Sequence, residues 1–110
     1  MLIEKNNENI STVRRVLVLF LEQQQWLRAK WAAVWLEERG DIAARVVLVE
    51  LMIRLEQYTE ALETLTRLPI SIRKMTNVRR LEARAIFALG HSALAKKIYL
   101  SSLDKTPSIL

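Results

Sequence analysis

Trp26-Leu27-Arg28-Ala29 recurs in altered form as Tyr58-Thr59-Glu60-Ala61 and again as Ser92-Ala93-Leu94-Ala95. The alanines that end these segments lie 32 and 34 residues apart. A self-similar period near 34 residues is typical of tetratricopeptide-type repeats, each of which is a helix-turn-helix hairpin. The small residue matters because it lets the second helix of a hairpin approach the first closely. The spacing therefore predicts an all-α fold, with three helical hairpins in a short right-handed solenoid that has a concave groove.

The composition is that of a globular helical protein. Of the 110 residues, 51% are hydrophobic and 26% are charged, with two Gly, two Pro and no Cys. One domain with its own core is expected, made of long helices and brief turns, and the absence of Cys excludes disulfides and thiolate metal sites. The net charge of +5 is spread over pairs such as Arg79-Arg80 rather than over long basic runs, which argues against nucleic-acid binding. No signal-peptide pattern or membrane-spanning apolar stretch is present, so we expect a cytoplasmic protein without membrane insertion.

Capping residues and helix breakers divide the chain into six expected helices. Ser11 or Thr12 is expected to cap the first helix, Gly40 to end the second, Asp41 to cap the third and Pro69 to end the fourth. The expected helices cover about residues 12–23, 27–39, 42–55, 58–68, 72–89 (or 76–89) and 92–103. The repeats then cover about residues 10–39, 41–69 and 72–107, in a domain of residues 10–104 between a flexible N-terminus (1–9) and a C-terminal tail (105–110).

The third hairpin departs from the pattern at one position. Extending the register back from Ala95 places Ala83 at a close-packed site and Ile86 inward, but it also points Glu82 toward the interior. Either the helix is rotated, or Glu82 reaches solvent or pairs with a neighbouring Arg. The acidic pairs Glu37-Glu38 and Glu60-Glu63 are expected on outward helix faces, where they serve solvation.

The residues that catalysis or metal binding would need are not grouped in this sequence. The single His, His91, lies in a Gly-His-Ser turn with no carboxylate or Cys at ligand spacing. There is no Gly-rich phosphate loop, no serine nucleophile elbow and no paired His for a metal. We therefore expect a protein that is not an enzyme and that uses no cofactor.

The expected groove offers a surface for binding another protein. In stacked hairpins the first helix of each pair lines the concave side, which places nine residues there: Arg14, Val18 and Leu21; Val46, Glu50 and Ile53; Arg80, Arg84 and Phe87. An apolar strip from all three hairpins suits an amphipathic helix, although Val46 or Ile53 can equally pack within the domain. Arg80 and Arg84, one turn apart, could clamp a peptide carboxylate, whereas Glu50 would repel an acidic tail.

Two tryptophans mark the second helix. Trp31 and Trp35 lie four residues apart and share a stripe with Leu27, distinct from the inner face that carries Ala29 and Ala33. Tryptophan at helical spacing is either part of the core, here packed under the third helix, or an anchor for a partner. The sequence leaves both readings open.

One segment resembles a known family. The run Ala33-Val34-Trp35-Leu36-Glu37-Glu38-Arg39-Gly40-Asp41-Ile42-Ala43-Ala44-Arg45 is similar to the Trp-Leu-Glu, Gly, Ala-Ala-Arg segment of type III secretion needle-subunit chaperones. The likeness continues through Gln57-Tyr58-Thr59-Glu60-Ala61-Leu62 and the Leu89-Gly90 turn, and it covers roughly residues 26–103. The first of these later segments is generic to helical repeats, whereas the run from Trp35 to Arg45 is more specific.

The resemblance implies a bacterial chaperone that is not an enzyme. Members of this family hold the needle subunit as a monomer, with its C-terminal amphipathic helix in the groove, in a ternary complex with a small helical co-chaperone. Carried over to this chain, the needle-helix groove would contain Val46, Glu50, Ile53, Arg80, Arg84 and Phe87. The co-chaperone side would contain Val18, Leu21, Trp31 and Trp35. The alternative is a helical-repeat adaptor that binds the peptide tail of another protein through Arg80 and Arg84.

Overall fold

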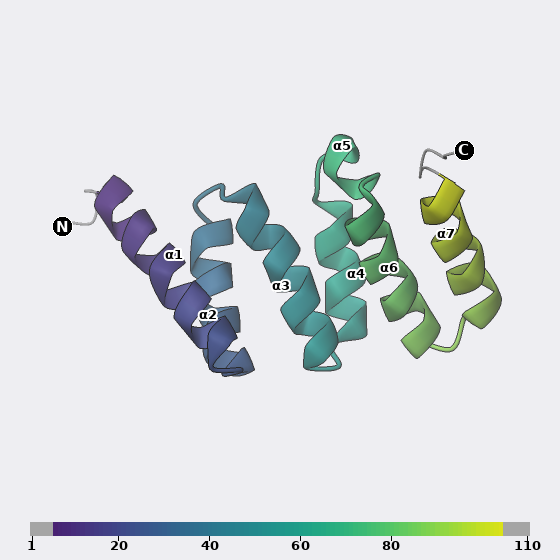
Figure 1. Ribbon diagram of the computed structural model, residues 1–110, viewed down its shortest axis with the longest axis horizontal. Coiled ribbons are helices and arrows are strands. Elements are labelled where there is room, and N and C mark those ends of the chain that lie inside the picture. The colour runs from purple at the N-terminus through teal and green to yellow at the C-terminus, as the bar shows by residue number, and fades with distance from the viewer. Residues whose placement is uncertain (1–5, 105–110) are drawn as a thin grey trace.

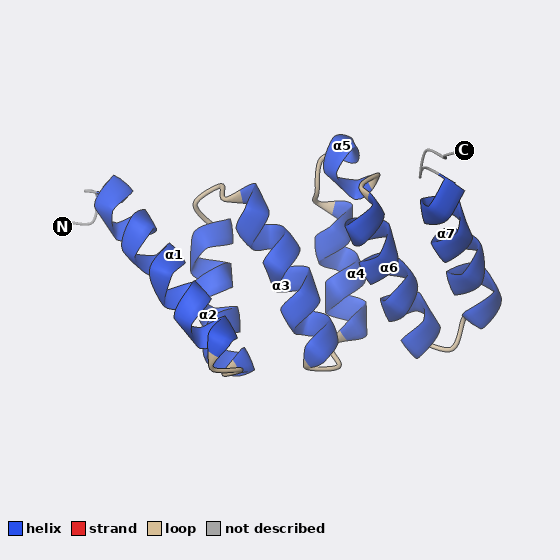
Figure 2. Ribbon diagram, in the orientation of Figure 1, coloured by secondary structure: helices blue, strands red, loops and turns tan. Residues whose placement is uncertain are grey.

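The computed structural model describes residues 6–104, with side-chain surroundings from residue 9 to residue 101. In this part of the chain every regular element is a helix, which confirms the all-α fold class (Figure 2). The helices are α1 (Asn6–Glu22), α2 (Trp26–Glu37), α3 (Ile42–Arg54), α4 (Tyr58–Thr66), α5 (Ile70–Arg73), α6 (Thr76–Ala88) and α7 (Ser92–Asp104). They follow one another along the longest axis, so that α1 and α7 lie at opposite ends (Figure 1).

Four of the turns between helices share one hydrogen-bond pattern. Each contains a residue with positive φ two or three residues after the end of a helix: Gln24 (57°), Gly40 (89°), Glu56 (62°) and Gly90 (96°). The N–H of this residue donates to the carbonyl three residues back, and the next N–H donates to the carbonyl five residues back, which is the Schellman motif. Gln24, Glu56 and Gly90 are again 32 and 34 residues apart, so the period seen in the alanines is also a period of turns.

The repeated alanines occupy the close contacts between helices. Ala29, Ala61 and Ala95 are all buried, and their N–H groups donate to the carbonyls of Gln25, Gln57 and His91. Side chains from α1, α2, α3, α4 and one face of α6 form the main core. A second, smaller cluster joins α6 to α7 through Ala83, Ile86, Ala95 and Ile98, with Leu62 packed against it. The expected inward positions of Ala83 and Ile86 are confirmed.

The helix boundaries depart from expectation at two places. Helix α1 already begins at Asn6, so the expected cap at Ser11 or Thr12 is wrong; Ile10 packs against the core, and no Gly or Pro precedes it. Between α4 and α6 the chain breaks twice, because Pro69 starts the short helix α5 instead of ending α4 directly. Residues 1–5 of the expected flexible N-terminus and the expected tail, 105–110, lie outside the described residues.

Ion pairs of buried or partly buried carboxylates connect neighbouring helices. Glu37 is not on an outward face, as the sequence suggested: its side chain is 8% exposed and lies between α2, α3 and α4. Its Oε2 accepts from Arg45 Nε at 3.1 Å and from Arg67 Nη1 at 2.7 Å. Arg45 lies on α3 and Arg67 directly follows α4, and both reach the end of α2. Glu82 pairs with Arg79 (3.1 Å) and Arg73 (3.5 Å), which confirms the expectation of a neighbouring Arg and ties α5 to α6.

Asp41 caps α3 as expected. Its Oδ1 accepts from the Ala44 N–H at 3.0 Å, and its Oδ2 accepts from Arg14 Nε at 2.9 Å. The first contact satisfies an otherwise unpaired donor of the helix N-terminus, and the second connects α1 to the start of α3.

Among the described helices, none is at once long and apolar enough to cross a lipid bilayer.

Candidate functional site

A strongly apolar hollow lies between α6 and α7. This groove has a volume of about 620 Å³ and is called the α6–α7 groove below. Its lining residues are Arg80, Ala83, Arg84, Phe87, Ser92, Ala93, Ala95, Lys96 and Tyr99. Arg80, Arg84 and Phe87 stand at spacings of four and three along α6, so one face of that helix supplies all three.

The floor and the rim of the α6–α7 groove differ in chemistry. Ala83, Ala93 and Ala95 keep the floor shallow and apolar, and Phe87, whose side chain is 63% exposed, supplies a large ring. Arg80, Arg84 and Lys96 place positive charge around it, with the Arg80 guanidinium carbon 5.6 Å from the centre of the Tyr99 ring. None of the side-chain carboxylates that the structure describes lies within ion-pair distance of these three cations.

The other residues expected in the needle-helix groove lie elsewhere. Ile53 is 4% exposed and belongs to the main core, so its placement in a binding groove is wrong. Val46 is half-buried and packs against the same core. Glu50 lines a separate hollow of about 230 Å³ together with Leu21 and forms an ion pair with Arg54 at 3.8 Å. The α6–α7 groove therefore contains three of the six expected residues.

The four residues expected on the co-chaperone side divide into two kinds. Val18 and Trp31 are exposed, the latter at 59%, and are available to a partner. Leu21 and Trp35 are half-buried and pack against the main core. Arg39 covers the Trp35 ring, with its guanidinium carbon 3.6 Å from the ring centre. Trp35 therefore matches the expectation of a core residue, whereas Trp31 lies on the surface, where a partner anchor is expected.

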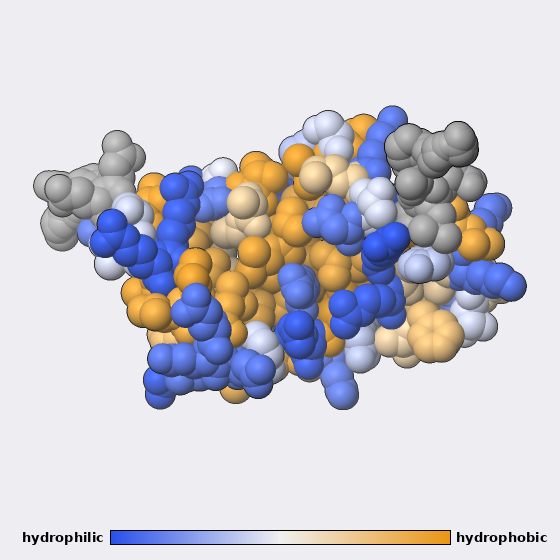
Figure 3. All heavy atoms as spheres, in the orientation of Figure 1, coloured by the Kyte–Doolittle hydropathy of each residue, from blue (hydrophilic) through white to orange (hydrophobic). Residues whose placement is uncertain are grey.

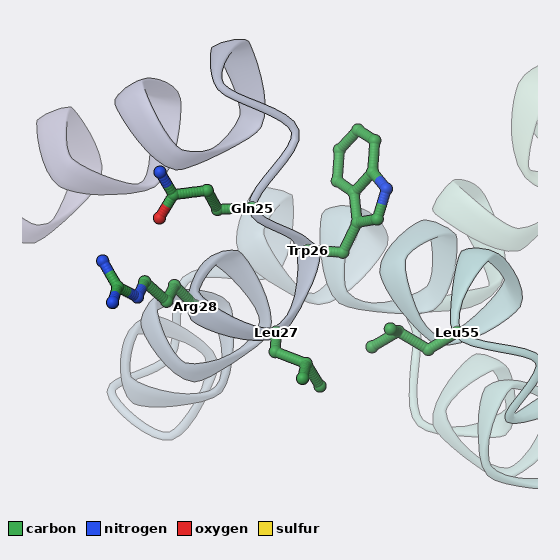
Figure 4. A pocket seen from close by; sticks show the side chains of 5 residues that line it. All are labelled: Gln25, Trp26, Leu27, Arg28 and Leu55. Carbon is green, nitrogen blue, oxygen red and sulfur yellow. The ribbon is translucent and has the colours of Figure 1, made fainter.

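A second hollow, with a mixed polar and apolar lining, lies where α2 begins. It has a volume of about 520 Å³, and the side chains of Leu27 and Leu55 point toward one another there, while Gln25 and Arg28 project away from Leu55 (Figure 4). Trp26 stands above this hollow, and the Arg54 guanidinium carbon lies 4.6 Å from its ring centre. Seen in the direction of Figure 3, hydrophobic side chains also gather over the middle of the molecule, among hydrophilic ones.

Sequence reasoning missed the α7 wall of the groove. Tyr99 and Lys96 complete it opposite Arg80 and Arg84, whereas the sequence placed the expected groove on the first helix of each hairpin. The repeat register contains the signal that identifies Tyr99, since it follows Ala95 by four residues as the buried Leu65 follows Ala61. Tyr99 is exposed, whereas the equivalent residue of the preceding hairpin, Leu65, is buried. This difference marks the open end of the described stack.

A metal site is not supported within the described residues, which hold no group of three or more potential ligands among His, Cys, Asp and Glu. His91 is exposed in the turn before α7. The chain matches no known protein-family model, no curated protein and no solved structure. The resemblance to needle-subunit chaperones therefore stays a prediction from the sequence, and the α6–α7 groove is the feature on which a functional proposal can rest.

Proposed function

We propose that this protein is a chaperone of a type III secretion system that keeps a needle subunit monomeric in the bacterial cytoplasm. The C-terminal amphipathic helix of that subunit would bind in the α6–α7 groove. A small helical co-chaperone would bind at the other end, on the first hairpin, where Val18 and Trp31 are exposed. The hairpins would then be tetratricopeptide-like repeats in a short right-handed solenoid, and the protein would act by binding alone, without a cofactor.

The observation that carries this proposal is the apolar floor of the α6–α7 groove between cationic rims. Exposed apolar surface of this kind commonly marks a protein-binding site. An amphipathic helix is an occupant that suits an apolar groove between two helices. The recurring turns and alanines support the repeat assignment, and the run from Trp35 to Arg45 supports the choice of family.

The mechanism would be competition by burial. A needle subunit polymerises through the apolar face of its helix, and a chaperone that covers this face removes the monomer from the assembly equilibrium. Phe87 offers the largest apolar side chain in the groove, so its truncation to Ala should weaken binding by about 2 kcal/mol. No bond is made or broken, and release needs only a competing partner for the helix.

Co-expression with a type III needle subunit tests the proposal. The wild-type chain should keep the subunit in the supernatant after high-speed centrifugation, and Phe87→Asp should release it into pelletable filaments. Leu94→Asp is the matched control, because Leu94 is exposed on the same hairpin but does not line the groove. A wild-type chain that retains no subunit would overturn the function, and full retention by Phe87→Asp would overturn the groove assignment.

An adaptor that binds a peptide tail is the second candidate. It is favoured by Arg80 and Arg84, which line the groove one turn apart and have no carboxylate partner among the described side chains. Such a site would hold a terminal carboxylate by paired hydrogen bonds. Amidation of the tail should then abolish binding, whereas a helix held along the groove would bind equally well with either terminus.

A further inference from the structure

The α6–α7 groove is the place where the first helix of a next hairpin would lie. Leu21, Ile53 and Phe87 occupy the same position, three residues before the turn residues Gln24, Glu56 and Gly90. Leu21 is half-buried and Ile53 is 4% exposed, whereas Phe87 is 63% exposed. The same position is therefore covered in the first two hairpins and open in the last.

The second helix of the hairpins shows the same contrast. Ala33, Leu65 and Tyr99 each follow the repeated alanine by four residues. Ala33 and Leu65 are buried, the latter at 1% exposure, and Tyr99 is 43% exposed. In the second hairpin, α6 packs against both α3 and α4 and so supplies a cover. Among the described helices, no further helix takes the equivalent place on α6 and α7.

Helix α6 itself indicates what such a cover looks like. It places Val78, Leu81 and Ala85 in the main core, in the cluster that contains Ile53 and Leu65. These residues stand at i, i+3 and i+7, the apolar stripe of one helix face. A helix seated on α6 and α7 in the same manner would need a stripe with this spacing opposite Phe87 and Tyr99.

The charge around the groove selects among possible helices. Arg80, Arg84 and Lys96 line it, so a helix with acidic residues on both sides of its apolar stripe gains attraction, and one with basic residues is repelled. A second copy of this chain would offer α1 as the free first helix at the other end of its stack. Its exposed side chains include Arg14 and Arg15 as well as Glu22, so that helix has no acidic excess and a second copy is a poor match.

We propose that the α6–α7 groove binds an acidic amphipathic helix of another protein, which takes the place of the first helix of a fourth hairpin. This inference rests on the proposed function in that both assign a helix to the same groove. It adds the acidic character of the partner and the way in which its helix is seated. Both additions concern the chemistry of recognition and are testable without a secretion subunit.

Two synthetic helical peptides provide the test. Both carry apolar residues at the spacing of Val78, Leu81 and Ala85; one has Glu at the flanking positions and the other has Lys. Fluorescence anisotropy at low salt should show the Glu peptide binding at least about tenfold more tightly than the Lys peptide. The preference should shrink at about 1 M salt, where screening acts over only a few ångströms.

Variants of the protein locate the binding to the groove. Arg80→Glu/Arg84→Glu should reverse the preference in favour of the Lys peptide, and both positions are exposed, so the fold should persist. Phe87→Ala should weaken the Glu peptide by about tenfold or more, whereas Leu94→Ala, outside the groove, should leave it unchanged. Circular dichroism of each variant checks that the helices are intact.

Several outcomes would overturn the inference. Equal binding of both peptides, or an unchanged preference in the double charge reversal, would exclude an acidic partner at this site. Self-association in analytical ultracentrifugation that Phe87→Ala abolishes would assign the groove to a second copy. If the Glu peptide binds as expected but no needle subunit is retained, the proposed function fails and this inference stands. If a needle subunit is retained but the two peptides bind equally well, this inference fails and the proposed function stands.

Discussion

Glu37 brings a negative charge into the interior where α2, α3 and α4 meet. Its Oε2 accepts from both Arg45 and Arg67, and Arg67 also donates to Thr64 Oγ1 at 3.4 Å. Removing one charge from a buried cluster leaves its partners desolvated without a counter-charge. Because the Arg67 side chain is about half exposed, part of that penalty is relieved by water.

We therefore expect Glu37→Gln to lower the free energy of unfolding by about 1–2 kcal/mol. Glu38→Gln is the matched control, since Glu38 is the exposed neighbour and should change stability by less than about 0.5 kcal/mol. Urea unfolding followed by circular dichroism measures both. If both variants lose the same free energy of unfolding, the buried cluster around Glu37 contributes no more to stability than an exposed charge does.

Asp41 makes the cap of α3 sensitive to acid. Partial burial by itself would raise the pKa of the Asp41 carboxyl, but the hydrogen bond from the Ala44 N–H and the hydrogen bond and charge of Arg14 hold that pKa below its ordinary value of 3.8. A carboxyl whose pKa is lower in the folded state contributes stability above its unfolded pKa. That contribution is lost as the pH falls through the folded pKa.

Asp41→Asn should separate the cap from the charge, because Asn caps helices about as well as Asp does. At pH 7 the variant should be less stable than the wild type by about 0.5–1 kcal/mol. The gap should close as the pH is lowered below 3.8, since the wild-type carboxyl then loses its charge. Urea midpoints at pH 7, 5 and 3 measure it, and a gap that stays constant with pH would contradict the assignment.

At the scale of single residues, the sequence predicted the positions whose environment is set by local geometry. Gly40, Asp41 and the three repeated alanines are such positions, since turns and close helix contacts allow few alternatives. Glu37 and Ile53 were misplaced because their burial depends on side chains from other helices. Phe87 lines the α6–α7 groove and stays exposed, because no later hairpin covers it among the described residues.

At the scale of elements, the turn after α3 is strained in a way that can be relieved. Glu56 has φ of 62°, a left-handed conformation that glycine adopts without steric cost. Glu56→Gly should therefore raise the free energy of unfolding by about 0.5 kcal/mol. The same substitution in the middle of α4, Glu63→Gly, should lower it by about 1 kcal/mol. Urea midpoints give both signs, and a loss in both variants would show that the turn at Glu56 carries no strain.

The helix lengths show where local signals are insufficient. Gly40 and Gly90 end their helices as the sequence indicated, because glycine favours the positive φ that a Schellman motif needs. Gln24 and Glu56 form the same motif without a glycine signal. The region from Pro69 to Thr76 folds into α5 and a turn, where Arg73 pairs with Glu82 and Ile72 packs against the main core. Spacing in the sequence does not reveal these contacts.

At the scale of the whole molecule, stability is distributed unevenly along the stack. Helix α3 lies between α2 on one side and α4 and α6 on the other, whereas α7 packs mainly against α6. The cluster that holds α7 is also small, with Leu62 as its link to α4. Amides in α7 should therefore exchange with solvent at least about tenfold faster than those in α3, because local opening there exposes less apolar surface.

A ligand in the α6–α7 groove should reverse this difference in stability between α7 and the rest of the stack. A helix that packs on both α6 and α7 stabilises the closed form of that hairpin in proportion to its occupancy, so opening of α7 must then include release of the ligand. With the Glu-flanked peptide at saturation, hydrogen exchange measured by mass spectrometry should slow in α6 and α7 and stay unchanged in α1. Phe87→Ala under the same conditions should show little slowing, because the peptide no longer saturates the site. Protection that appears in α1 and α2 instead would place the partner on the first hairpin, around Leu27 and Trp31, and would make that exposed surface the binding site.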